Sequence, residues 1–500
     1  MNHTERTPMS AMKLLPLVLL VLLVAALAGC SLIPTYQRPE AAVPASYPGN
    51  PARPAGQTTA TTTAASVSWQ AYFTDARLQE LIGIALRNNR DLRVATLNIE
   101  QARATFQVQR AALYPVLGAT VAGSRSEPSL LGTGVAVSNS ISLGIAAWEL
   151  DLFGRIGSLK DVALAQFLAT DEARKAVQVS LIGAVANGWL SVLADDELIE
   201  LTRQTLQTRQ ESVRLTKLRF DNGVSSEIDF QLTTGLLESA RATYAQQQRQ
   251  RQLDENALAL LLGQPLPAPA PSSVSLSYDG SDKFTPKYER SGLGMAGFAP
   301  MPELPVGLPS DLLTQRPDIR QAEQLLVAAN ANIGAARAAF FPRISLTTSI
   351  GTASRQLSGL FGAGSQAWNF APQVTLPIFD AGRNQANLDA SRVQRSIAVA
   401  QYDKAVQTAF REVSDALAGR DTLGEQLRAT RAQAEAEAVR FRLSDLRFRN
   451  GIASALDLLD SQRSLFTAQQ GAVQARLALL QNQVTLYKTL GGGWTGQSAR

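Results

Sequence analysis

The stretch that decides the fold is Arg219-Phe220-Asp221-Asn222-Gly223-Val224, which recurs 228 residues later as Arg447-Phe448-Arg449-Asn450-Gly451-Ile452. Leu262-Gly263 matches Leu490-Gly491 at the same offset. Nearer the N-terminus, residues 111–115 are echoed at an offset of 227. An offset that stays constant to one residue over about 170 positions predicts an internal duplication.

The duplication sets the boundaries that we expect. Many prolines lie between the two halves, and such a stretch forms neither regular helix nor central strand. The expected segments are a signal peptide at 1–29, a lipid-anchored tether at 30–68, a first repeat at 69–263, a proline-rich linker at 264–308, a second repeat at 309–490 and a C-terminal tail at 491–500.

Each repeat is predicted to run in the order helix, two strands, long helices. The predicted ranges are about 76–113, 116–147 and 156–262 in the first repeat, and about 309–341, 343–377 and 381–490 in the second. Breaks in the long helices are expected near Asp195 and Gly419. The two Asn-Gly pairs mark a further stop, because both residues tolerate left-handed backbone. Each restart has a capping box, Ser226-x-x-Asp229 or Ser454-x-x-Asp457.

The lengths and patterns of the long helices and strands predict packing partners for the helices and either lipid or a protein core for the strands. The run 156–193 alone would be roughly 57 Å long as a helix and needs antiparallel coiled-coil partners along its flank. The strand runs alternate apolar with small polar residues over about 9–11 positions, the length of a transmembrane β-strand. A soluble sandwich would show the same alternation. Aromatic residues near the strand ends fit either an interfacial girdle or a core: Tyr114, Phe340, Phe341, Trp368 and Phe370.

Four strands cannot close a barrel, since bacterial barrels begin at about eight. Open strand edges are not tolerated in lipid. Membrane-spanning strands would therefore have to be pooled, about eight from two chains or twelve from three. After Gly29 no stretch of 18 apolar residues occurs, so no transmembrane helix is expected in the mature chain.

The chain has one histidine and one cysteine, His3 and Cys30. The N-terminus has the pattern of a secretory signal: two basic residues, Arg6 and Lys13, and then an apolar run from Leu14 to Leu27. Small residues follow this run and lead directly to Cys30. We expect Cys30 to be acylated and to become the first mature residue. The mature chain then lacks the histidine of a catalytic triad and the clustered ligands of a zinc site. With 47 Lys+Arg against 42 Asp+Glu and no basic run interleaved with aromatics, no nucleic-acid partner is expected.

Taken together, these features resemble the TolC-like outer membrane factors, in particular the OprM-type (NodT subfamily) efflux lipoproteins. The resemblance covers essentially the whole mature chain. The motifs that carry it are Cys30-Ser31-Leu32-Ile33-Pro34, Trp148-Glu149-Leu150-Asp151-Leu152-Phe153-Gly154-Arg155, Leu308-Pro309-Ser310-Asp311-Leu312-Leu313, Leu376-Pro377-Ile378-Phe379 and Leu490-Gly491-Gly492-Gly493-Trp494.

The resemblance implies an α+β membrane protein that forms a homotrimer. Each protomer would give four strands to one twelve-stranded outer membrane β-barrel, and the long helices would form a periplasmic α-helical barrel. The duct would serve a tripartite multidrug efflux pump with a periplasmic adaptor (membrane fusion) protein and an inner-membrane RND transporter. It would act as a passive conduit without a cofactor, in keeping with the lack of a phosphate-binding P-loop.

The resemblance also implies a closure at the periplasmic helix tips. With breaks near 195 and 419, Asp415 is predicted as an acidic gate residue, with Arg411 and Arg420 as partners. A solvated charge at a helix end is an equal alternative. The predicted adaptor-contact tips are Asp195, Asp196, Gly419 and Asp421.

Three alternatives remain. A duct of the same architecture could serve metal-ion efflux or type I protein secretion, although no Met or His cluster favours metal. A periplasmic adaptor lipoprotein would also be helical and lipid-anchored, but it should lack the repeat and the membrane-length strands. An enzyme has no constellation of residues to support it.

Overall fold

The computed structural model describes residues 31–40, 43–44, 46–47, 67–126, 136–267, 295–304 and 315–494. Cys30 and the predicted signal peptide lie outside these residues. The chain forms two compact units, and each draws on both repeats. The strand unit consists of residues 1–40, 97–171 and 321–404, and the hairpin unit of 41–96, 172–320 and 405–500. The duplication therefore does not divide the molecule into one unit per repeat.

The strand unit contains a four-stranded antiparallel sheet in the order β1-β2-β3-β4. Its strands are β1 (Leu117–Ser126), β2 (Ala136–Leu150), β3 (Arg343–Ser354) and β4 (Gln366–Thr375). The 3₁₀ turn η3 (Leu357–Gly359) lies between β3 and β4. The register brings the alternating apolar positions of all four strands to one face, because Leu143 pairs with Ala119 and with Ile350, and Ile350 pairs with Trp368.

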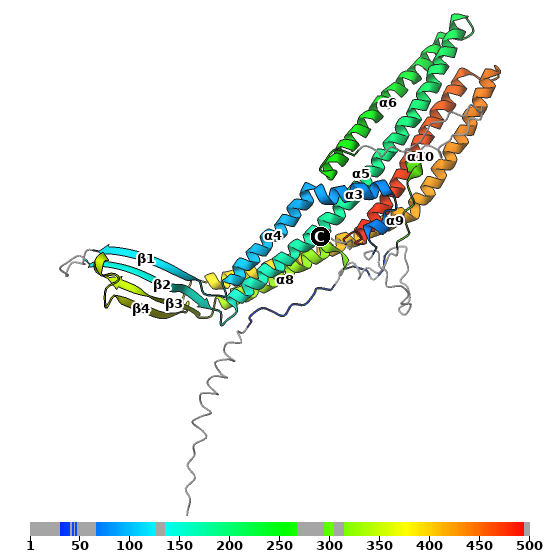
Figure 1. The fold of residues 1–500 in the computed structure, drawn as a ribbon. Helices are drawn as coiled ribbons and strands as arrows, with labels where there is room; N and C mark the ends of the chain where they lie inside the picture. The colour runs from blue at the N-terminus through cyan, green and yellow to red at the C-terminus, as the bar shows by residue number, and fades with distance from the viewer. Residues whose placement is uncertain are drawn as a thin grey trace, which may run out of the picture. The chain divides into compact units, whose positions relative to one another are not determined.

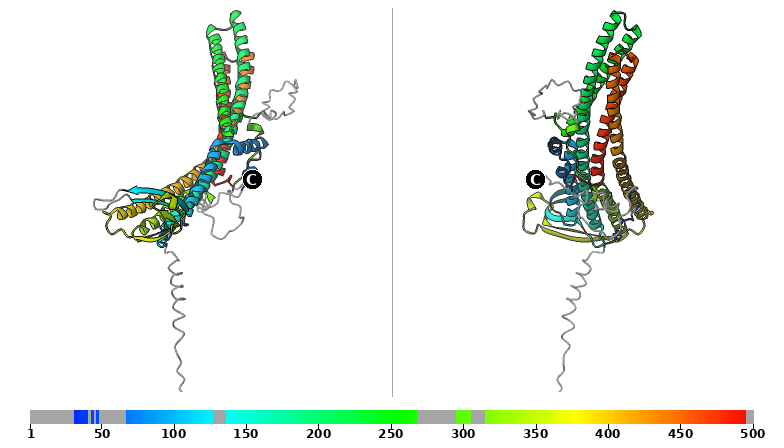
Figure 2. Two further views of the ribbon diagram at one scale, coloured as in Figure 1. Left: turned by 60° about the vertical axis from the view of Figure 1, so that its left-hand side comes forward. Right: turned by 90° about the vertical axis from the view of Figure 1, so that its right-hand side faces the viewer.

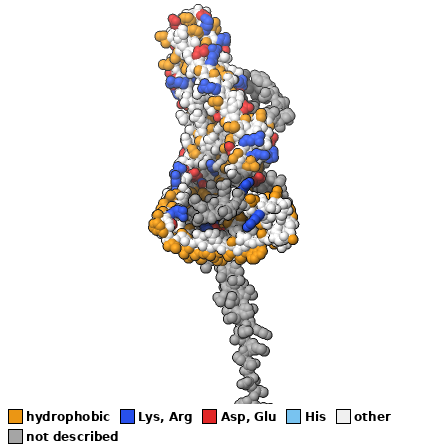
Figure 3. Space-filling model, turned by 90° about the vertical axis from the view of Figure 1, so that its left-hand side faces the viewer, with side chains coloured by type: hydrophobic (Ala, Val, Ile, Leu, Met, Phe, Trp, Pro, Cys, Tyr) orange, Lys and Arg blue, Asp and Glu red, His pale blue; other side chains and the backbone are white. Residues whose placement is uncertain are grey.

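The apolar face of this sheet is not covered by the protomer. Trp368 is 79% exposed, and Val121, Ile350 and Phe370 are exposed as well. Figure 3 shows hydrophobic side chains gathered along the outer side of the curved sheet. A soluble sandwich would bury this face, so the alternation does not come from a packed core. The aromatic residues at the strand ends are likewise exposed rather than core residues.

The hairpin unit contains the greater part of two long antiparallel helical hairpins (Figures 1 and 2). The first is α5 (Arg155–Asp221) with α6 (Glu227–Leu262), and the second is α9 (Arg383–Arg449) with α10 (Ala455–Thr489). Both α5 and α9 have 67 residues, which is about 100 Å of helix. Helices of this length are stable in water only with packing partners along their length.

Two short helices, α2 (Trp69–Tyr72) and α3 (Ala76–Asn88), pack with α5, α6 and α10 around an aromatic core in the hairpin unit. Most of α4 (Arg90–Ala111) and of α8 (Pro317–Ala338) belongs to the strand unit, and η2 (Met295–Gly297) lies in the linker. Tyr72 stacks on Tyr487 of α10 with ring centroids 4.2 Å apart, and Phe73 meets Tyr487 edge-on. The Tyr72 hydroxyl donates to the Gln483 carbonyl at 2.9 Å, so the polar tip of this buried ring is satisfied.

The predicted breaks near Asp195 and Gly419 are wrong, since α5 and α9 run through both positions. Glycine in a helix costs about 1 kcal/mol relative to alanine and does not end the helix by itself. Gly419 is explained by packing: a Cβ there would come within 2.3 Å of the Asn482 Oδ1 on α10. The Asn482 amide occupies that space and donates to the Ala416 carbonyl at 2.9 Å.

Among the described residues, α5 also contains an 18-residue window that is apolar enough to cross a membrane. Almost half of that window is buried inside the protomer, as expected of a core helix in a bundle. The apolar character of α5 is therefore accounted for by helix packing.

Candidate functional site

The ends of the two hairpins are turns of nearly identical geometry, at 222–226 and 450–454. The Asn222 side chain donates to the Leu218 carbonyl at 2.7 Å, and Asn450 does the same to Leu446 at 2.7 Å. Gly223 and Gly451 both adopt left-handed backbone, with φ of 71° and 72°. The Asn-Gly pairs thus end α5 and α9 and reverse the chain, as their local chemistry predicts.

Both predicted capping boxes are formed. Ser226 Oγ accepts from the Asp229 N–H at 3.2 Å, and Ser454 Oγ accepts from the Asp457 N–H at 3.2 Å. Each aspartate in return accepts from the backbone N–H of its serine at 3.3 Å. The reciprocal bonds satisfy two N–H groups at each helix start, so α6 and α10 begin at fixed positions.

The turns expose large apolar side chains. Val224 and Ile228 on the first hairpin, and Ile452 and Leu456 on the second, are between 62% and 79% exposed. Other apolar side chains near the turns, among them Leu218 and Leu446, are exposed as well, and such a grouping is typical of a surface that meets another protein.

A charge cluster distinguishes the second hairpin from the first. Asp460 accepts from Arg440 of α9 at 2.5 Å and from Arg463 at 2.6 Å, and these guanidinium groups lower its pKa. At the position of Asp460 the first repeat has Leu232. The cluster lies within three helical turns of the hairpin end and was missed from the sequence. The signal that could have found it is the capping box, because its serine, Ser454, lies only six residues before Asp460 and marks the end of the hairpin.

The predicted gate residues lie in the middle of α9. Asp415 pairs with Arg411 at 3.6 Å on the exposed helix surface, and Arg420 pairs with Asp421 at 3.1 Å instead of with Asp415. Asp415 precedes Arg449 at the end of α9 by 34 residues, which is about 51 Å along a helix. The gate assignment of Asp415, Arg411 and Arg420 stays a prediction, but its premise of a nearby helix tip is wrong.

The predicted adaptor-contact residues are also mid-helix, and two of them lie between α5 and α6. Asp196 binds Arg251 of α6 at 2.6 Å. Asp195 is 8% exposed and hydrogen-bonds Asp254 of α6, and burial together with the Asp254 carboxyl raises the pKa of Asp195 to about 7. Gly419 contacts Asn482, as described above. Because no chain reversal occurs here, Asp195, Asp196, Gly419 and Asp421 are not tip residues.

The segment that follows Cys30 is bound along α8 in the strand unit. Arg38 forms a two-pronged pair with the buried Glu323 at 2.7 and 2.8 Å, and the Tyr36 hydroxyl donates to the same carboxylate at 3.1 Å. Further along α8, the Asn330 amide donates to the Pro34 carbonyl at 2.7 Å, and Arg337 donates to the Leu32 carbonyl at 3.1 Å. We call residues 31–38 the strap. Cys30 itself lies outside the described residues, and its acylation stays a prediction.

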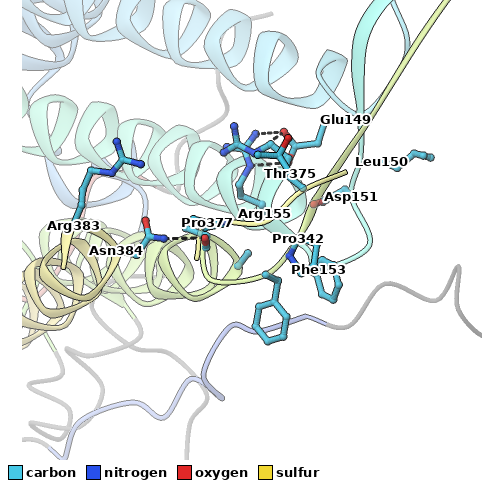
Figure 4. A pocket seen from close by; sticks show the side chains of 14 residues that line it. Glu149, Leu150, Asp151, Phe153, Arg155, Pro342, Thr375, Pro377, Arg383 and Asn384 are labelled. Atoms are coloured by element: carbon cyan, nitrogen blue, oxygen red, sulfur yellow. Dashed lines mark hydrogen bonds and ion pairs between the residues drawn. The ribbon is translucent and has the colours of Figure 1, made fainter. Parts of the chain in front are cut away.

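A cavity of about 280 Å³ lies where the strands end and the long helices begin (Figure 4). Arg155 forms a two-pronged pair with Glu149 at 2.7 and 2.8 Å on one side of it. Asp151 accepts from the Ile156 N–H at 3.0 Å and from the Gly157 N–H at 2.6 Å. These bonds fix the start of α5 against the end of β2, so Glu149, Asp151 and Arg155 are accounted for by structural contacts.

Comparison with known proteins identifies the family. The family model described as "outer membrane efflux protein" matches residues 81–264 and 308–492, one segment in each repeat. The chain belongs to the outer membrane efflux protein family. The antibiotic efflux pump outer membrane protein ArpC and the toluene efflux pump outer membrane protein TtgC, both from Pseudomonas putida, are 45% identical over 479 residues, 95% of each chain. OprJ of Pseudomonas aeruginosa is 42% identical over 94% of each chain.

Solved structures of this family have the same fold. A membrane protein of Pseudomonas aeruginosa aligns with a TM-score of 0.83 and 39% identity over 94% of this chain and 99% of its own. The open state of the Neisseria gonorrhoeae MtrE outer membrane channel aligns with a TM-score of 0.81 and 39% identity, over 93% and 99%. The predicted resemblance to TolC-like channels is confirmed. The chain is an outer membrane efflux protein that extends into the periplasm, and the sandwich and adaptor alternatives are wrong.

Proposed function

We propose that this outer membrane efflux protein is the passive exit duct of a tripartite RND-type multidrug efflux pump. Relatives with 45% identity are named for antibiotic and toluene efflux, which supports small apolar or amphipathic toxic molecules as cargo. The energy would come from the inner-membrane transporter, and the chain itself would carry out no catalysis. The remaining alternatives are metal-ion efflux and type I secretion through the same architecture.

The observation that carries the proposal is the four-stranded sheet with an exposed apolar face and two open edges. Strands β1 and β4 each have one hydrogen-bonding edge without a partner in the described part of the protomer. Lipid does not satisfy such edges. Three copies that join β4 to β1 would form a closed barrel of twelve strands, which is the homotrimer that the resemblance implies.

The hairpin turns are the proposed contact with the periplasmic adaptor protein. Val224 and Ile228 on one hairpin and Ile452 and Leu456 on the other are exposed, and the capping boxes fix the backbone that presents them. Burying these side chains in an interface would remove apolar surface from water, which is favourable by about 25 cal/mol per Å² before the costs of association are subtracted. These turns replace the mid-helix positions predicted from the sequence.

The Asp460 cluster is the proposed gate at the helix ends, and Asp415 with Arg411 is the second candidate. Three copies of an aspartate around a channel axis repel one another and favour cations. Asp460→Asn should change single-channel conductance and cation selectivity in planar bilayers, and Asp415→Ala is measured beside it. The variant that leaves both quantities unchanged is excluded from the constriction.

The function is tested by deleting the gene and measuring antibiotic and solvent susceptibility together with dye accumulation. The deletion should raise both, and the wild-type gene should restore them; a Cys30→Ala form tests the need for the lipid anchor. Unchanged susceptibility and accumulation would refute drug efflux. Sensitivity to copper or silver salts alone would instead favour the metal-efflux alternative.

A further inference from the structure

One contact joins the two hairpins near their turns. The Arg219 guanidinium of α5 lies over the Phe448 ring of α9, with 4.8 Å from Cζ to the ring centroid. Both side chains are half-buried. Such a cation–π contact stabilises by about 0.5–1 kcal/mol where it is exposed and by more where it is desolvated. It therefore contributes to the packing of the first hairpin against the second.

The internal duplication maps this contact onto a second pair of the same residue types. At the offset of 228, Arg219 corresponds to Arg447, and Phe448 corresponds to Phe220. Other contacts between the hairpins do not repeat in this way. Arg209 lies over Phe466 at 5.4 Å, but the corresponding positions carry two glutamates, which cannot form this contact.

The second pair is not formed inside the protomer. Phe220 is 37% exposed and stacks on Phe230. Arg447 is exposed, and its guanidinium has no ion pair, hydrogen bond or ring contact among the described residues. Its neighbour Arg449 differs, because it pairs with Asp445 of the same helix at 2.8 Å. Arg447 and Phe220 therefore have the residue types that a cation–π contact needs, but they do not meet within one protomer.

We propose that Arg447 of one protomer stacks on Phe220 of the next protomer in the trimer. The turns have the same geometry in both repeats, and α5 and α9 have the same length, so the two hairpins present equivalent residues at equivalent heights. Within one protomer, the second hairpin packs beside the first. If the first hairpin of the next protomer packs beside this second hairpin in the same way, its Phe220 would lie against Arg447. Six alternating Arg–Phe contacts would then run around the end of the helical barrel. The inference rests on the proposed homotrimer.

Cross-linking tests this inference directly, because the mature chain has no cysteine other than the predicted acylated Cys30. Arg447→Cys with Phe220→Cys, treated with a short bismaleimide, should give covalent dimers and trimers on denaturing gels. The matched pair, Arg219→Cys with Phe448→Cys, should be joined within one protomer, as seen by peptide mass spectrometry, and should give no oligomeric band. Each single-cysteine variant serves as the background control.

The native mass of each variant separates the two levels of the proposal. A monomeric protein would refute the homotrimer and this contact with it. A trimer whose Arg447/Phe220 pair gives only monomer bands, while the Arg219/Phe448 pair is joined, would refute the contact alone. As a second measurement, Arg447→Ala should lower the temperature at which trimers dissociate, whereas Arg449→Ala should leave it unchanged. Equal dissociation temperatures for wild type and Arg447→Ala would also overturn the inference.

Discussion

Replacing Asp195 with asparagine should remove a pH dependence from the first hairpin. Asp195 of α5 is buried against Asp254 of α6, and burial, reinforced by the Asp254 carboxyl, raises its pKa from 3.8 to about 7. The charged groups around the pair are Arg251 and Glu255 on α6 and Asp196 and Glu197 on α5; Arg476 of α10 faces Glu197. The second repeat has Asn482 at the position of Asp254, so a neutral amide already fills this place once in the chain.

The sign follows from proton binding. Between about pH 4 and pH 7 the folded hairpin holds a proton on Asp195 that the unfolded chain releases, so stability falls as the pH rises through this range. A pKa raised by about three units corresponds to at most roughly 4 kcal/mol. Asp195→Asn cannot ionise, and the hairpin should keep its stability up to pH 8.

Hydrogen–deuterium exchange of peptides that cover 190–200 and 248–258 measures this effect, after correction for the intrinsic exchange rate at each pH. Protection in the wild type should decrease from pH 5 to pH 8, and protection in Asp195→Asn should be nearly constant. Asp196→Asn is the matched control: it loses the Arg251 pair and should be less protected while the slope is retained. A wild type with no slope, or an Asp195→Asn variant with an unchanged slope, would refute the reasoning.

Three further outcomes are expected. Gly419→Leu should displace the Asn482 amide and lower the free energy of unfolding by about 1–3 kcal/mol. Gly424→Ala should be neutral or stabilising, because a Cβ there meets nothing within 4 Å. Thermal unfolding followed by circular dichroism compares the two variants. Ser454→Ala removes one capping box and should cost about 1 kcal/mol, visible as faster amide exchange at the start of α10, and unchanged exchange would contradict it. Arg38→Ala removes the cation from the buried Glu323 carboxylate and should cost about 1–3 kcal/mol, since the Arg38 side chain is itself 45% exposed. Limited proteolysis should then cut the strap sooner than in Arg38→Lys, and equal cleavage rates would show that the ion pair does not hold the strap.

Local sequence patterns predicted the features that local chemistry determines. The Asn-Gly pairs and the capping boxes fixed both hairpin turns, and the period-two alternation located all four strands. The continuity of α5 and α9 was not predicted, because its causes lie on other helices. From the sequence alone, Asp195 and Gly419 suggest helix ends. In the structure, Asp195 contacts Asp254 of α6, and Gly419 leaves space for Asn482 of α10. The division into two compact units was also missed, since it depends on which distant segments pack together.

The equal lengths of α5 and α9 constrain how this protein can change. Each residue inserted into a helix displaces its end by about 1.5 Å. An insertion of four residues in α5 alone would raise the first turn by about 6 Å above the second and would leave a partner in contact with only half of the turns. The hairpins could therefore extend further and still contact a partner with both turns only if α5, α6, α9 and α10 all changed in length together. A chimera that exchanges one hairpin for that of a longer relative should fail to assemble a working pump, while one that exchanges both should succeed with an adaptor of matching length.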